Sequence, residues 1–193
     1  MSGIFEELQW RGLVAQTTDE ETLKAALDGN PITFYGGFDP TAQSLHIGHL
    51  VLVLTMRRLQ LAGHHPIALV GGATGLIGDP RPTKERAMQS SDVVAGWVGQ
   101  IRNQIAPLLA FDGANPAVMV NNLDWTNPIS AIEFLRDIGK YFRMSTMLNR
   151  DIVARRLASE DGLSYTEFSY QILQALDFRE LHQKYDCVLQ VGG

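Results

Sequence analysis

Three short apolar runs, each bounded by proline, glycine or asparagine, stand out in the hydrophobic pattern. They comprise residues 31–35, 66–70 and 116–120, and their length and composition are typical of buried strands. Longer stretches with helical periodicity separate them. Apolar strands that alternate with helices predict an α/β fold, a Rossmann-like doubly wound parallel sheet with flanking helices.

Polar and apolar positions recur with a helical period over most of the remaining chain. The predicted helices span residues 4–10, 19–29, 45–63, 83–109, 127–138, 144–157 and the segment from 164 onward. Ser44, Asn127 and Ser164 are expected to cap three of them, because short polar side chains accept hydrogen bonds from free backbone N–H groups. Gly96 and Gly99 predict a break or a close packing contact in the fourth helix.

Length and composition favour one folded domain. With 193 residues, of which 45% are hydrophobic, the chain is long enough to bury a core, and it contains no visible repeat or linker. We therefore expect residues 1–193 to form a single domain with residues 1–30 as an N-terminal helical extension. The net charge of −5 argues against broad electrostatic binding of nucleic acid.

Cysteine usage and hydropathy bear on the compartment. The single cysteine, Cys187, excludes an internal disulfide framework and fits a reducing environment. No apolar run approaches the roughly 20 residues that a membrane span needs. Residues 1–11 also lack the charged and apolar regions of a signal peptide. We expect a cytoplasmic protein.

Candidate binding residues follow the predicted strands, where ligands bind in folds of this type. Tyr35, Gly71 and Asn122 lie at the three carboxyl ends. The loop at residues 71–80 contains four glycines but matches neither a Walker motif nor a Rossmann glycine motif. Such a loop is by itself more typical of a turn than of a site. Asp79 at its end is nevertheless suited to binding an ammonium group.

Two histidines flank a glycine at the start of the helix after the first strand. His46 and His49 are three residues apart, so they share one helix face. At the positive end of a helix, imidazoles and backbone N–H groups favour phosphate oxygens, and Gly48 leaves room for a flat base. Histidines at this spacing are more often simply solvated, and as zinc ligands these two lack partners, so we predict no protein-bound metal.

The helix that begins at Ser164 carries Tyr170, Gln174 and Asp177 at positions i, i+4 and i+7. On an arbitrary helix, a row of polar residues is usually the solvent side. A phenol, a carboxamide and a carboxylate in line also suit a small zwitterionic ligand that has its own phenol. The residues alone leave both interpretations open.

The motifs that contain these residues resemble those of the class I aminoacyl-tRNA synthetases, and specifically of the bacterial-type tyrosyl-tRNA synthetases. The resemblance runs essentially from end to end. The matching motifs are Y-G-G-F-D-P-T-A-x-S-L-H-I-G-H, G-G-A-T-G-L-I-G-D-P, N-x-D-W, F-S-Y-Q-I-L-Q-A-x-D and L-Q-x-G-G. It implies a class I catalytic domain that binds ATP and an amino acid.

Carried over position by position, the resemblance implies a tyrosine pocket. The implied contacts are Tyr35 and Asp177 at the phenol, Asp79, Tyr170 and Gln174 at the ammonium group, and Asn122 elsewhere in the pocket. Polar groups built for a hydroxyl are left unpaired by phenylalanine, and this discrimination by tyrosyl-tRNA synthetases is the standard illustration of the effect. An indole has no group for that pair either, which argues against tryptophan.

The resemblance also implies a set of ATP-binding residues. The implied contacts are Thr41, His46 and His49 at the phosphates, Gly48 near adenine, Asp39 and Gln190 near the sugar or the α-amino region, and Gly37. Thr41, His46 and His49 are the implied catalytic residues, since they stabilise charge during phosphate transfer. Lys84 and Arg86 are candidate pyrophosphate contacts, although the sequence around them departs from the usual family pattern.

The implied reaction proceeds in two steps without a covalent enzyme intermediate. The carboxylate of L-tyrosine attacks the α-phosphate of ATP, which binds with Mg²⁺, and pyrophosphate leaves. The terminal ribose hydroxyl of tRNA(Tyr) then attacks the adenylate. Catalysis rests on positioning and on charge stabilisation.

Further partners follow from the resemblance. It implies a homodimer, with the helices at residues 128–157 as the candidate surface. Four arginines are a candidate face for the tRNA acceptor stem, but charges on a helix are more often simply solvated; they are Arg143, Arg150, Arg155 and Arg156. Three tryptophans are expected to pack rather than to contact ligands; they are Trp10, Trp97 and Trp125.

The family pattern continues beyond Gly193, so we expect an N-terminal catalytic fragment that binds tyrosine and whose turnover is in doubt. Two alternatives remain open. A small nucleotidylyltransferase would use the same histidine helix without needing the tyrosine-binding set. A non-catalytic module would bind tyrosine or a partner without activating the amino acid.

Overall fold

A four-stranded parallel sheet forms the centre of the protein, in a computed structural model that describes residues 3–79, 89–160 and 162–192. The strands are β1 (Thr33–Phe38), β2 (His65–Val70), β3 (Val118–Asn121) and β4 (Cys187–Val191), in the order β3-β2-β1-β4. All three neighbouring pairs are parallel. The predicted fold class and three predicted strands are confirmed. The fourth strand was missed, because it is a short edge strand with exposed residues and no clear apolar run.

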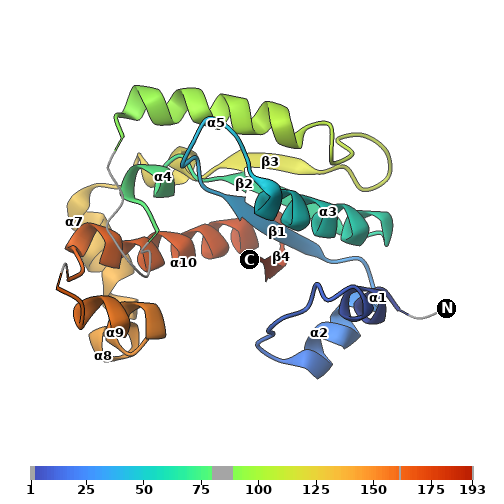
Figure 1. Ribbon diagram of the computed structural model, residues 1–193, viewed down its shortest axis with the longest axis horizontal. Coiled ribbons are helices and arrows are strands. Elements are labelled where there is room, and N and C mark those ends of the chain that lie inside the picture. The colour runs from blue at the N-terminus through green and yellow to red at the C-terminus, as the bar shows by residue number, and fades with distance from the viewer. Residues whose placement is uncertain (1–2, 80–88, 161, 193) are drawn as a thin grey trace.

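Helices connect and cover the strands (Figure 1). They are α1 (Ile4–Trp10), α2 (Glu20–Leu27), α3 (Ile47–Leu61), α4 (Thr74–Ile77), α5 (Ser91–Ile105), α6 (Leu123–Thr126), α7 (Ala131–Glu133), a π-helical turn (Phe134–Ile138), a 3₁₀ turn (Gly139–Tyr141), α8 (Met144–Leu148), α9 (Asp151–Leu157) and α10 (Tyr165–Tyr185). In the part of the chain that is described, no helix is long and apolar enough to cross a membrane.

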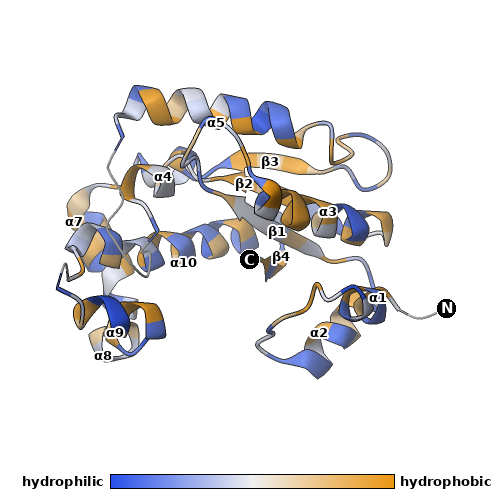
Figure 2. Ribbon diagram, viewed as in Figure 1, coloured by the Kyte–Doolittle hydropathy of each residue, from blue (hydrophilic) through white to orange (hydrophobic). Residues whose placement is uncertain are grey.

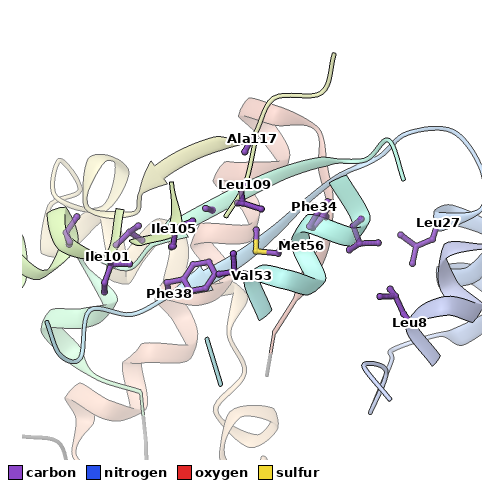
Figure 3. Close-up of a cluster of buried hydrophobic side chains, with 14 of the residues drawn as sticks. Leu8, Leu27, Phe34, Phe38, Val53, Met56, Ile101, Ile105, Leu109 and Ala117 are labelled. Atoms are coloured by element: carbon purple, nitrogen blue, oxygen red, sulfur yellow. The ribbon is translucent and has the colours of Figure 1, made fainter. Parts of the chain in front are cut away.

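Alternate residues of β1 face two different hydrophobic clusters. Phe34 and Phe38 pack against Val53 and Met56 of α3 and against residues of α5, as Figure 3 shows. Tyr35, between them, belongs to a second cluster with residues of α10. Because side chains alternate along a strand, the sheet separates α3 and α5 on one side from α10 on the other (Figure 1).

Figure 2 shows why these elements assemble in this way. Hydrophobic residues concentrate in β2 and β3, whereas they alternate with hydrophilic residues along α5. The helix therefore offers one apolar face to the sheet, with Val94, Val98, Ile101 and Ile105 buried on it. Gly96 and Gly99 have open space where a Cβ would be. The predicted break or close contact at these glycines is therefore wrong, because they face away from the core.

Several predicted helix ends also differ from the structure. His46 rather than Ser44 caps α3, and Ser130 rather than Asn127 caps α7 in a box with Glu133. The helix predicted at residues 144–157 is two helices, α8 and α9. At the starts of α3 and α7, more than one nearby residue can cap the helix, and contacts with other elements determine which one does.

A buried ion pair joins α9 to the start of α10. The Arg156 guanidinium donates to both carboxylate oxygens of Glu167, at 3.2 and 2.8 Å, and each side chain is 1% exposed. The Arg156 Nε also donates to the Gly162 carbonyl. Arg156 was a candidate for a basic surface, and its burial shows that it is not part of one. Glu167 is occupied by this contact, so Ser164 caps α10 without the reciprocal capping-box bond.

Candidate functional site

The carboxyl ends of β1, β2 and β3 meet at one edge of the sheet and carry the polar loops that the sequence pointed to. Asp39 follows β1, Gly71 follows β2, and Asn122 follows β3. Helix α10 runs beneath this edge (Figure 1), and it contacts α4 and β4. Side chains from four separated segments therefore converge where ligands bind in doubly wound sheets.

The carboxylate of Asp177 lies buried at the centre of this edge. It is 3% exposed. Its Oδ1 accepts a hydrogen bond of 2.9 Å from the indole N–H of Trp125, and its Oδ2 accepts one of 3.0 Å from the amide of Asn122. Burial raises the pKa of Asp177 to about 7, because loss of water outweighs these two donors. The solvent-side interpretation of this helix face is wrong at Asp177.

A second carboxylate, Asp39, is connected to Asp177 through hydrogen bonds of the Thr74 and Asn122 side chains. The Tyr170 hydroxyl donates to Asp39 Oδ2 at 2.8 Å, and the Thr74 hydroxyl donates to Asp39 Oδ1 at 2.6 Å. Thr74 in turn accepts a hydrogen bond of 3.0 Å from the amide of Asn122. Burial and the charge of Asp39 raise the pKa of the Tyr170 phenol, so it remains a donor.

Tyr35 has a buried hydroxyl that no described residue satisfies. The side chain is 2% exposed, and its Oη has no hydrogen-bond partner in the described structure. Its ring lies 5.9 Å from that of Phe178 on α10. Burial and the nearby charge of Asp177 raise the pKa of Tyr35. Because buried hydroxyls are almost always paired, this atom is well suited to form a hydrogen bond with a ligand at this edge.

A cleft of about 380 Å³ opens between α9 and α10 beside these carboxylates. Asp79, Tyr170 and Gln174 line it together, as the sequence predicted for a cation-binding set. The α9 segment contributes Arg150, Asp151 and Arg155 to the lining. The cleft therefore offers groups of both charges and amides, a composition that suits a polar ligand.

The two histidines stack at the start of α3. Their ring centroids are 3.9 Å apart. His46 Nδ1 accepts from the Gly48 N–H at 3.1 Å, and His49 Nδ1 accepts from the His46 N–H at 3.2 Å. An accepting Nδ1 assigns the proton to Nε2 in each neutral ring. Burial and the neighbouring His46 lower the pKa of His49. The exposed ends of both rings are thus N–H donors.

Glycines permit close approach at this edge. A Cβ at Gly71 would overlap the Asp39 carboxylate and the Thr74 hydroxyl, and one at Gly48 would lie 3.0 Å from the His46 ring. Gly37 has open space at the same position. At Gly71, therefore, the missing side chain makes room for two of the protein's own site side chains.

The structure brings most of the predicted site residues to one edge. Gln190 of β4 is the register partner of Tyr35, and the Thr41 N–H donates to the Asp39 carbonyl at 2.9 Å. Lys84 and Arg86 lie outside the described residues. No group of three or more His, Cys, Asp or Glu among residues 3–79, 89–160 and 162–192 is arranged to hold a metal ion.

Sequence reasoning missed two contributors. Thr74 was read only as part of a glycine-rich turn, and Trp125 only as a packing residue. Trp125 does pack in the second cluster, but its indole also orients Asp177. Trp10 is 79% exposed, with the Arg11 guanidinium over its ring, so the expected packing is wrong there. The available signal was that Thr74 and Trp125 lie within the same two motifs as Asp79 and Asn122.

Comparison with known proteins gives a consistent result. The family model described as tRNA synthetases class I (W and Y) matches residues 27–193. The chain is 66% identical to the tyrosine–tRNA ligase of Streptomyces coelicolor and 60% identical to that of Kineococcus radiotolerans, over 193 residues in both cases. It covers 46% of each of these relatives, so the chain spans about half of their length.

Solved structures agree with the sequence relatives. A C-terminally truncated mitochondrial tyrosyl-tRNA synthetase from Aspergillus nidulans superposes with a TM-score of 0.91 at 31% identity, over 100% of this chain and 57% of that one. The tyrosyl-tRNA synthetase from Archaeoglobus fulgidus superposes with a TM-score of 0.67 at 21% identity, over 93% of this chain and 51% of its own. At that identity the second match supports the fold alone.

Removing the Tyr35 hydroxyl is expected to stabilise the ligand-free protein. Tyr35→Phe should raise the free energy of unfolding by about 1 kcal/mol, because an unpaired buried hydroxyl is removed. The matched variant Tyr170→Phe loses a hydrogen bond to a carboxylate and should lower it by about 2 kcal/mol. Urea denaturation measures both. A loss of stability in Tyr35→Phe equal to that in Tyr170→Phe would contradict the assignment of an unpaired hydroxyl.

Proposed function

Because the chain belongs to the family of class I tRNA synthetases for tryptophan (W) and tyrosine (Y), we propose that it forms the catalytic domain of a tyrosine–tRNA ligase. The domain comprises residues 1–193, with residues 1–30 as a helical extension. The ligase activates L-tyrosine with ATP, releases pyrophosphate and transfers the tyrosyl group to tRNA(Tyr). The curated relatives at 60% and 66% identity bear this name.

One observation carries the choice of tyrosine. The unpaired, buried Tyr35 hydroxyl and the buried Asp177 carboxylate lie in one apolar cluster, and the charge of Asp177 acts on Tyr35. A bound phenol pairs with both groups. Its oxygen accepts a hydrogen bond from the Tyr35 hydroxyl, and its O–H donates one to the Asp177 carboxylate. Phenylalanine and tryptophan offer no such group, and the buried polar pair then remains unsatisfied.

The ammonium end of tyrosine fits the cleft lined by Asp79, Tyr170 and Gln174. Asp79 supplies the negative charge, and the two neutral side chains supply oxygens. Asn122 supports the pocket from below by holding Asp177. The amino acid then lies across the sheet edge with its carboxylate free to act as the nucleophile.

ATP is proposed to bind above the start of α3. The Nε2–H groups of His46 and His49 donate to phosphate oxygens as negative charge develops, with Thr41 beside them. The remaining contacts in this proposal are Gly37, Asp39, Gly48 and Gln190. Mg²⁺ arrives with the ATP phosphates, since it prefers phosphate and water oxygens to an all-protein cage.

The partners and the compartment are part of the same proposal. tRNA(Tyr) supplies the acceptor hydroxyl, and Arg143, Arg150 and Arg155 are the candidate contacts with its acceptor stem. A cytoplasmic location is supported by the single, buried and free cysteine, Cys187.

Selective tyrosine binding is the first test of the proposal. Calorimetric titration of the 193-residue chain should give binding of L-tyrosine and far weaker binding of L-phenylalanine. In Asp177→Ala this selectivity should disappear, because the hydroxyl loses its charged acceptor. Glu21→Ala, which removes an exposed carboxylate of α2 in the N-terminal helical extension, is the matched control and should retain it.

The same sample then tests catalysis by tyrosine-dependent exchange between ATP and pyrophosphate. Exchange distinguishes a ligase domain from a module that only binds tyrosine. Retained discrimination against phenylalanine in a folded Asp177→Ala variant would overturn the phenol assignment.

Tyrosine affinity is expected to depend on pH through Asp177. Burial raises the pKa of this carboxyl to about 7, so below that pH a proton must leave before the phenol can donate to the carboxylate. The affinity for L-tyrosine should therefore fall about tenfold from about pH 8 to about pH 6. The affinity for L-phenylalanine should stay constant. Equal pH profiles for the two ligands would contradict this linkage.

A homodimer is supported by an apolar surface on consecutive elements from α7 to α8. Five large hydrophobic side chains are at least 36% exposed there; they are Ile132, Leu135, Tyr141, Met144 and Leu148. Exposed large hydrophobic side chains gathered on neighbouring elements are a feature of protein interfaces.

The mass of the chain in solution tests the dimer. Light scattering should give a dimer for the native chain and a monomer for Leu135→Arg, because a charge in an apolar interface is costly. Leu61→Arg changes a leucine at the end of α3 that is 71% exposed, against 56% for Leu135, and should remain dimeric. A monomeric native chain would overturn the proposed surface.

A further inference from the structure

We propose that Thr74 is a positioning residue that couples the two ends of the tyrosine pocket, so that its hydroxyl contributes to discrimination of the phenol that Asp177 recognises. The inference rests on the function proposed above and extends it to a side chain with no contact to the phenol. The hydrogen-bonded row Asp39–Thr74–Asn122–Asp177 carries it.

The hydrogen bonds in this row have only one consistent direction. A threonine hydroxyl has one proton, and at 2.6 Å from the Asp39 carboxylate that proton points to Asp39. The Thr74 oxygen must then accept from Asn122. Both protons of the Asn122 amide are thereby used, one for Thr74 and one for Asp177, while its oxygen accepts from the Ala73 N–H at 2.7 Å.

Because each hydrogen bond in the row has a fixed direction, the orientation of the Asn122 amide depends on the Thr74 hydroxyl. The carboxylate of Asp39 polarises the Thr74 hydroxyl, which becomes a stronger acceptor, and this holds the Asn122 amide in the plane that also serves Asp177. Without the hydroxyl, one Asn122 N–H has no partner in a site where Asn122 is fully buried. The amide then turns or recruits water, and Asp177 loses a fixed donor.

The local backbone is built around this hydroxyl. Thr74 is 2% exposed and begins α4 directly after the β2 loop. A Cβ at Gly71 would overlap both the Thr74 hydroxyl and Asp39. Only glycine at this position leaves room for the hydrogen bond between Thr74 and Asp39. This steric requirement is separate from any backbone requirement of the turn.

The ratio of two dissociation constants separates this role from simpler ones. If Thr74 only supported the fold or the ammonium end through Asp39, its loss would weaken tyrosine and phenylalanine equally, since both carry an ammonium group. If it couples Asp39 to Asp177, its loss weakens tyrosine more. The readout is therefore the Kd for L-phenylalanine divided by the Kd for L-tyrosine.

Calorimetric titration of the 193-residue chain and its variants provides the test. Thr74→Val, which keeps the shape and loses the hydroxyl, should lower the ratio about tenfold or more. Thr74→Ser restores the hydroxyl and should keep the ratio within about twofold of the native value. Thr126→Val is the matched control, because the Thr126 hydroxyl, one residue from Trp125, has no partner in the described structure; its ratio should not change.

An unchanged ratio in a folded Thr74→Val variant that still binds tyrosine would overturn the inference. Circular dichroism reports whether the variant folds, and Thr74→Ala, which suits a helical position, replaces it if the valine variant does not. A native chain that shows no selective tyrosine binding would instead overturn the proposed function. The two failures are therefore distinguishable.

Discussion

Burial of a carboxylate at the edge of the sheet is the constraint on which the site depends. Asp177 lies on α10 in a cluster of apolar side chains, where a charge without partners would be very costly. Its two donors come from the segment that follows β3. The loop after β3 must therefore end at a fixed distance from α10, and the loop after β2 must reach Asn122 with Thr74.

The same constraint explains how the site divides into two parts. The proposed tyrosine pocket lies on the α10 side of the sheet, whereas the histidines lie at the start of α3, which packs on the opposite side. Asp39 follows β1, the strand whose alternate residues face both sides. On one side, Asp39 accepts a hydrogen bond from Tyr170. On the other side, the ring of the preceding residue, Phe38, contacts the ring of His49. The end of one strand thus fixes the positions of the two proposed binding regions relative to each other.

The sequence predicted the features that depend on local pattern and failed where distant contacts decide. Periodicity predicts the three apolar strands and places Tyr170, Gln174 and Asp177 on one helix face, whereas only the family resemblance implies that these three residues form a site. The choice of His46 over Ser44 as the cap of α3 does not follow from local pattern, because Gln104 of α5 occupies Ser44 instead. The hydrogen bond of Thr74 does not follow from local pattern either, since its partner Asn122 is 48 residues away.

The hydrogen bond between Tyr170 and Asp39 has a consequence for the order of folding. It joins residues 131 positions apart in the sequence, and contacts of such separation form late because a long loop must close first. The sheet of β1, β2 and β3 needs only local crossovers, whereas the pocket needs α10 to dock. During synthesis the start of α3, with its two histidines, can therefore form before α10 docks and completes the proposed tyrosine pocket.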